Sequence, residues 1–92
     1  MENTLTDEMV KSKIKKVEYT VLGDHKTTVA NLYLENGYTV QGMSSCVDPE
    51  NYDKELGEKI SYNNAVQEVW KRESYLLAQR RYEAGLVKTD GE

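Results

Sequence analysis

Residues 27–41 read TTVANLYLENGYTVQ, two strand-like runs joined by Asn36-Gly37. Thr, Val, Tyr and Leu dominate residues 27–34, and residues 38–41 continue in the same style, which favours extended backbone. Asn-Gly supplies the positive φ that both central positions of a type I′ turn need. The stretch therefore predicts a β-hairpin closed by a two-residue turn.

A further strand precedes the hairpin. Val17, Tyr19 and Val21 alternate with polar residues, which is the period of two that a strand gives. Gly23-Asp24-His25 is a typical turn composition. The order predicts a three-stranded antiparallel meander, and it leaves open whether one face of the sheet or both faces are covered.

Helices are expected on both sides of this meander. Thr6 suits an N-cap, and apolar residues at one-turn spacing predict a short helix over about residues 7–14. Asp48-Pro49-Glu50 is a helix start. From there either one long helix runs over about residues 49–82, or two helices meet between residues 60 and 75. We expect an α+β fold in one domain over residues 1–92.

The long helical segment is too long for a small sheet to cover alone. A single helix of that length would span roughly 50 Å, more than the diameter of a small domain. We therefore expect a break in the helix or an overhang onto a partner subunit. Gly85 is a reasonable C-cap. Residues 1–5 and 86–92 are expected to be flexible tails.

Composition narrows the function classes. The 92 residues carry a formal charge of −4, which argues against a general nucleic-acid binder. Cys46 is the single cysteine, no apolar run reaches the length of a membrane span, and the N-terminus does not resemble a secretory signal. These features fit a cytosolic setting. A thin core whose aromatics are Tyr and Trp favours a homodimer or higher homo-oligomer.

The sequence contains no recognisable catalytic motif. His25 is the single histidine and lies in a turn, which makes a zinc site improbable, and Cys46 is expected to behave as a small buried hydrophobe. The acids of residues 48–58 complement a helix start rather than form a calcium loop. We expect a protein that is not an enzyme, with no metal and no cofactor.

Several residues are of the types that grip a nucleotide. Tyrosine stacks on a base, amides read base edges, and arginine pairs with phosphate in a bidentate manner. The candidate ligand-binding residues are Tyr52, Tyr62, Asn63, Asn64, Arg80 and Arg81. Composition alone does not show that they converge; the alternative is that Tyr52 packs on the sheet while the amides and arginines are solvated.

Four blocks of the sequence carry a family resemblance. They are LENGYTVQG at residues 34–42, SSCVDPENYDKELGEK at 44–59, AVQEVW at 65–70 and ESYLL at 73–77. This pattern resembles the Gp-forty-nine/sixty-six family of small phage proteins over about residues 14–82. Members often carry Pro after the Trp and Gly before Tyr-Leu-Leu, where this chain has Lys71 and Ser74. That departure favours a more continuous last helix.

The resemblance implies a phage origin and a place in the host cytoplasm. The layout is also similar to anti-Thoeris sponge proteins of the Tad-one type, oligomers that hold a cyclic ADP-ribose signal between subunits without cleaving it. This implies a counter-defence protein that sequesters a cyclic ADP-ribose isomer or a cyclic oligonucleotide. The alternatives are an inhibitor that binds a host defence protein directly and a small phage assembly protein.

Overall fold

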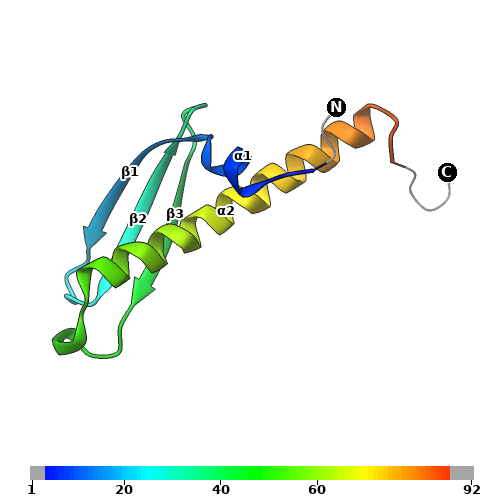
Figure 1. Cartoon of the computed structure of the whole chain (residues 1–92). Coiled ribbons are helices and arrows are strands. Elements are labelled where there is room, and N and C mark those ends of the chain that lie inside the picture. The colour runs from blue at the N-terminus through cyan, green and yellow to red at the C-terminus, as the bar shows by residue number, and fades with distance from the viewer. Residues whose placement is uncertain (1–3, 88–92) are drawn as a thin grey trace.

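A computed structural model describes residues 4–87. The chain folds as a short helix, a three-stranded antiparallel sheet in the order β1-β2-β3, a 3-10 turn and a long helix (Figure 1). This confirms the predicted α+β meander and its long C-terminal helix. The element bounds are α1 Asp7–Lys11, β1 Ile14–Val21, β2 Thr27–Leu34, β3 Thr39–Ser45, η1 Pro49–Asn51 and α2 Lys54–Glu83.

Helix α2 covers one face of the sheet and leaves the other open (Figure 1). The core lies between that face and the helix, and its buried apolar residues are Val10, Ala30, Leu32, Leu34, Val40, Ala65, Val66 and Val69. The open face carries polar side chains that form hydrogen bonds between neighbouring strands. Tyr33 of β2 donates to Glu18 of β1, and Gln41 Nε2 of β3 donates to Asn31 Oδ1 of β2 at 2.6 Å. The strand pattern left open whether one face of the sheet or both faces are covered. The structure shows that only one face is covered.

Gly42 lets α2 approach the sheet closely. It pairs with Ala30 of β2 and is buried beneath the helix. A Cβ at this position would lie 2.8 Å from the Cα of Ala65 and closer still to backbone atoms of Ala65 and Ser61. Because those neighbours are backbone atoms, no side-chain rotation relieves the clash. The absence of a side chain on β3 thus fixes the height of α2 above the sheet.

The turn of the β2–β3 hairpin differs from the predicted type I′ turn. Gly37 has φ 90°, whereas Asn36 is not in the left-handed region. The Gly37 N–H donates to the Leu34 carbonyl at 3.0 Å, and the Leu34 N–H donates to the Tyr38 carbonyl at 2.8 Å. This is a three-residue loop, with glycine alone taking the positive φ. Asn36 contributes through its side chain instead, because its Oδ1 accepts from the Tyr38 N–H at 3.0 Å.

The first helix is shorter than the predicted 7–14. Thr6 caps α1 by accepting from the Met9 N–H, but the helix ends at Lys11 and Ile14 already belongs to β1, opposite Leu34. The one-turn spacing of the apolar residues fits both conformations, and pairing with β2 decides between them. Leu5 packs against the core, so the expected flexible tail over residues 1–5 is wrong at this residue. Residues 1–3 and 88–92 of the predicted tails lie outside the described residues.

The long helix begins five residues later than predicted. Asp48 and Pro49 start only the turn η1, after which Tyr52 is extended with ψ 129° and Asp53 caps α2 by accepting from the Leu56 N–H. The Tyr52 hydroxyl shares a 3.0 Å hydrogen bond with Thr28 Oγ1 on β2. This contact ties residue 52 to the sheet, so the backbone turns before the helix can start.

Of the two alternatives for the C-terminal segment, one continuous helix is found. The 30 residues of α2 end in a Schellman motif at Gly85, with φ 76°. A helix of that length spans about 45 Å, whereas an eight-residue strand spans about 27 Å. The last turns of α2 therefore extend beyond the end of the sheet, as Figure 1 shows.

Candidate functional site

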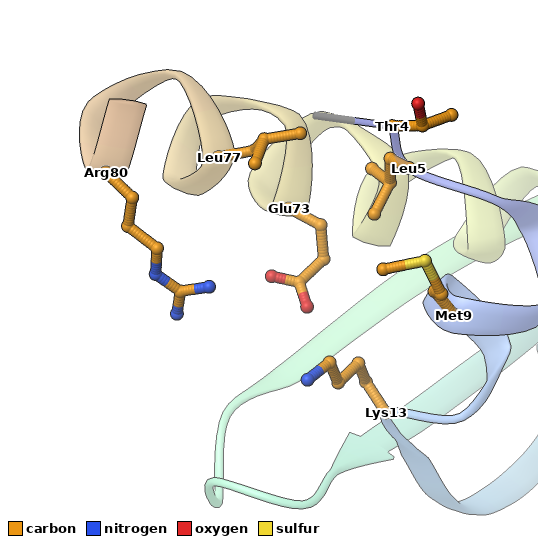
Figure 2. A pocket seen from close by; sticks show the side chains of 7 residues that line it. All are labelled: Thr4, Leu5, Met9, Lys13, Glu73, Leu77 and Arg80. Atoms are coloured by element: carbon orange, nitrogen blue, oxygen red, sulfur yellow. The ribbon is translucent and has the colours of Figure 1, made fainter. Parts of the chain in front are cut away.

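A groove runs along the last turns of α2, and we call it the α2 groove. It consists of two adjoining cavities of about 260 Å³ each, which share Lys13, Glu73 and Arg80. The first cavity opens toward α1, where Leu5, Met9 and Leu77 form its apolar wall. The second opens toward the hairpin, between Leu34, Tyr38, Leu76 and Arg72. Figure 2 shows the Lys13, Glu73 and Arg80 side chains pointing into the same space, Lys13 from the turn between α1 and β1 and the other two from α2.

Local structure explains why these charges meet. Glu73 and Arg80 are seven residues apart on α2, which places them on one helix face two turns apart. The Lys13 carbonyl accepts a hydrogen bond from the Glu35 N–H at 2.9 Å. The Nζ atom of Lys13 lies 3.5 Å from the Glu35 carboxylate. The hairpin loop therefore holds Lys13 at the mouth of the groove.

Helix α1 is fastened to α2 beside the groove. The Trp70 indole N–H donates to the Asp7 carboxylate at 3.4 Å, and Lys11 Nζ lies 3.0 Å from the same carboxylate. The hydrogen bond from Lys11, with a smaller contribution from Trp70, lowers the pKa of Asp7. The carboxylate thus stays charged at neutral pH and keeps its two donors, which holds the apolar wall of the first cavity in place.

The hairpin side of the groove carries an aromatic ring and a guanidinium. The Arg72 guanidinium carbon lies 5.5 Å from the centroid of the Tyr38 ring, which is a cation–π distance. Arg72 also donates to the Glu68 carbonyl at 2.9 Å. Interaction with Tyr38, and then with Glu68, raises the pKa of Arg72. The Tyr38 side chain is 53% exposed, so one aromatic surface remains available beside a fixed positive charge.

This arrangement suits a particular ligand chemistry. Lys13, Arg72 and Arg80 can pair with phosphate oxygens, and guanidinium groups do so in a bidentate manner. The Tyr38 ring can stack on a planar base. Glu73 supplies a carboxylate that can accept hydrogen bonds from sugar hydroxyls, as acidic residues do for the ribose of dinucleotides. The apolar walls then bury the remainder of such a ligand.

The structure does not bring the six predicted site residues together in one place on the chain. Arg80 lies in the α2 groove, whereas Arg81, the next residue, does not line it. Tyr52 lies before the start of α2, about 40 Å from Arg80 along the helix axis. Its cavity of about 220 Å³ is lined by residues near β3 and the first turns of α2, among them Cys46, Leu56 and Ile60.

The three remaining predicted residues have other surroundings. Tyr62 is half-buried against the core. Asn64 Nδ2 donates to the Met43 carbonyl of β3 at 2.8 Å, so this amide serves the fold. Asn63 is exposed.

Sequence reasoning missed four groove residues, Lys13, Tyr38, Arg72 and Glu73. The helical spacing of Arg72, Glu73 and Arg80 was the available signal, since positions seven and eight apart share a face. Nothing in the sequence placed Lys13 or Tyr38 beside that face, because they reach it through the sheet.

Cys46 and His25 lie away from the groove. Cys46, predicted to be buried, is half-buried, and its thiol donates to the Asp48 carbonyl at 3.2 Å. His25 is exposed in the β1–β2 turn, with φ 60°. Across residues 4–87, no group of three or more His, Cys, Asp or Glu side chains is placed to hold a metal ion. Within the same residues, no helix is long and apolar enough to cross a membrane.

Comparison with known proteins identifies the family. The model of the phage protein (N4 Gp49/phage Sf6 gene 66) family matches residues 5–81, which takes in both the groove and the sheet. Searches of curated proteins and of solved structures each found no match. The matched range begins in the segment before α1 and ends in the last turn of α2. The chain therefore belongs to the phage protein (N4 Gp49/phage Sf6 gene 66) family.

Proposed function

We propose that this phage protein acts in the host cytoplasm by binding a cyclic nucleotide-type immune signal in the α2 groove and sequestering it without cleavage. The observation that carries the proposal is the convergence of Lys13, Arg72 and Arg80 around an apolar groove with an exposed Tyr38 ring. The ligand class is a cyclic ADP-ribose isomer or a cyclic oligonucleotide. Both offer phosphates, planar bases and sugar hydroxyls.

The charge balance of the groove supports a nucleotide over a bare phosphate. Glu35 partly neutralises Lys13 at its mouth, and Glu73 adds a second carboxylate between the cations. A site built only for phosphate would not place a carboxylate there, because it repels the anion. A ligand with both phosphates and hydroxyls satisfies the two arginines and the glutamate together.

Calorimetry on the full chain with a panel of cyclic ADP-ribose isomers and cyclic oligonucleotides tests this function. Binding to at least one ligand is expected, followed by recovery of that ligand intact after the complex is heat-denatured. Absence of both heat and thermal shift across the panel would refute the proposed function. Recovery of a hydrolysed ligand would refute sequestration without cleavage.

Arg80→Ala and Arg81→Ala form a matched pair that tests the location. They remove the same charge from adjacent residues, but only Arg80 lines the groove. Loss of a charge-assisted hydrogen bond is worth about 1.5–3 kcal/mol, so Arg80→Ala should weaken binding by about 10- to 150-fold. Arg81→Ala should weaken it much less. Equal losses in the two variants would exclude the α2 groove as the binding site.

A further inference from the structure

Strand β1 forms an edge of the sheet that α2 leaves partly uncovered, because the helix packs over β2 and β3. Ala30 of β2 is fully buried, whereas its partner on β1, Tyr19, is 39% exposed. Thr28 of β2 is likewise fully buried, and its partner Val21 is 45% exposed. Val17, Tyr19 and Val21 alternate onto this face, and we call them the β1 ledge. The ledge is an apolar row beside the helix that stays in contact with solvent.

The backbone groups of the ledge residues point away from the sheet. The Leu22 N–H donates to the Thr27 carbonyl at 2.9 Å, which assigns the hydrogen bonds with β2 to the even-numbered residues of β1 from Lys16 onward. The odd-numbered residues, and so the whole ledge, direct their N–H and C=O groups outward. Within residues 4–87, β1 has a neighbouring strand on one side only. Such an edge can pair with an extended peptide through main-chain hydrogen bonds.

One side of α2 faces the ledge. Asn64 donates to the Met43 carbonyl at 2.8 Å, so its side of the helix faces β3. Glu58 and Tyr62 lie about 120° and 160° away from Asn64 around the helix axis. Burial raises the pKa of Tyr19, and the nearby Glu58 carboxylate and Tyr62 hydroxyl raise it further. Glu58 and Tyr62 therefore stand beside the Tyr19 ring.

This side of the helix is acidic. Glu55 lies three residues before Glu58 and on the same face, and we call the two carboxylates the acidic wall. Glu58 is half-buried and Glu55 is exposed. Neither forms a salt bridge with another residue of the described chain. A carboxylate pair beside an apolar row suits a partner that carries a cation among apolar side chains.

We propose that the β1 ledge binds an extended, basic segment of another protein, which adds to the sheet as a fourth strand. Main-chain hydrogen bonds to the three ledge residues set the register, and apolar side chains of the segment cover the ledge. A Lys or Arg on the same side of the segment lies over the Tyr19 ring and pairs with the Glu58 carboxylate. The chemistry of the partner is thus an alternation of apolar residues interrupted by one cation.

Charge favours this occupant over a second copy of the chain. A two-fold pair of β1 strands would bring two acidic walls over one continuous sheet, where like charges repel. A basic segment neutralises the wall instead. The residues of the ledge and of the acidic wall do not line the α2 groove, so the proposal does not rest on the ligand site.

NMR titration of the nitrogen-15-labelled full chain with a short capped peptide tests the proposal. The peptide has seven residues, with threonine at the odd positions and valine, arginine and valine at the even ones, which sets arginine opposite Tyr19. We expect shifts of the Val17, Tyr19 and Val21 amide signals. Glutamate in place of the arginine should weaken binding by about tenfold or more, because it meets Glu58. Methylation of the arginine backbone nitrogen should abolish binding, because it removes the N–H that pairs with β1.

Glu58→Gln and Glu83→Gln form a matched pair of variants. Both remove one carboxylate from α2, but Glu83 is the last residue of the helix, far from the ledge. Glu58→Gln should weaken binding of the arginine peptide by about tenfold or more, and Glu83→Gln should change it by less than about twofold. Glu58→Lys should reverse the preference, so that the glutamate peptide binds better than the arginine peptide.

Several results would overturn the proposal. One is the absence of shifts at the ledge with the arginine peptide at millimolar concentration. Equal binding of the methylated peptide would exclude strand addition, and equal losses in Glu58→Gln and Glu83→Gln would exclude the acidic wall. Ledge signals that shift with protein concentration in the absence of peptide would assign the edge to a second copy of the chain.

Discussion

Adding one methyl group at Gly42 should push α2 away from the sheet. The new Cβ of Gly42→Ala would lie 2.8 Å from the Ala65 Cα, where carbon atoms prefer about 3.5–4.0 Å. The helix must therefore retreat by about 1 Å. A gap of that size costs neighbouring contacts a quarter to a half of their dispersion energy. The contacts affected are those of the core residues on the same helix face, Ala65, Val66 and Val69.

Overpacking of a close-packed core costs about 1–3 kcal/mol, and we expect about 2–3 kcal/mol here because the clash is with backbone. Urea unfolding followed by circular dichroism should show the midpoint falling by about 1–2 M, given m-values of about 1–3 kcal/mol/M. Gly23→Ala is the control, since its Cβ would meet nothing within 4 Å and its φ is not positive. A loss below about 0.5 kcal/mol for Gly42→Ala, the range of an ordinary surface substitution, would refute this close helix–sheet contact.

Three further variants test contacts around the ends of the sheet. Tyr52→Phe removes the hydrogen bond to Thr28 and should lower the free energy of unfolding, measured in urea, by about 0.5–1.5 kcal/mol. An unchanged free energy of unfolding would mean that the bond is not formed in solution. Gly57→Ala should cost less than Gly42→Ala in the same assay, because its Cβ would displace Thr28 Oγ1 from 2.7 Å and weaken the bond to Tyr52, while alanine gains about 1 kcal/mol of helix propensity; a loss like that of Gly42→Ala would contradict this. The Asp24 carboxylate accepts from the Thr27 hydroxyl and two backbone N–H groups, which lowers its pKa from 3.8. The stabilisation by this carboxylate is present above pH 3.8 and is lost as the pH falls through the lower pKa of the folded state. Thermal unfolding of Asp24→Asn should therefore show a smaller loss of stability below about pH 4 than the unsubstituted chain shows. An unchanged acid profile would count against the contact.

Local patterns predicted most of the sheet and failed where two conformations fitted the same residues. The strand over residues 27–34 was predicted with its exact bounds, because β-type residues lie between two turns. The spacing around Ile14 fitted a helix turn as well as a strand, and only pairing with Leu34 settles it. Pro49 is a good first helical residue, yet the bond between Tyr52 and Thr28 delays α2 until Lys54.

The candidate site was less predictable than the fold. Residue types suitable for a nucleotide were recognised, but of the six predicted residues only Arg80 lies in the α2 groove. Tyr52 is at the other end of the helix, and the Asn64 side chain donates its hydrogen bond to a backbone carbonyl of β3. Residue type shows what a side chain can bind, whereas convergence depends on how distant segments pack.

The sequence by itself determined the antiparallel meander, a helical C-terminal segment with its Gly85 cap, and the family, while it left open whether that segment is one helix or two. These depend on periodicity, turn residues and contiguous motifs, all of which are local properties of the chain. Tertiary structure alone decided where α2 begins, how closely it sits over Gly42, and that Lys13 and Tyr38 meet Arg72, Glu73 and Arg80. The physical reason is that these features are set by non-local pairing and packing, which bring together residues that no window of the sequence contains.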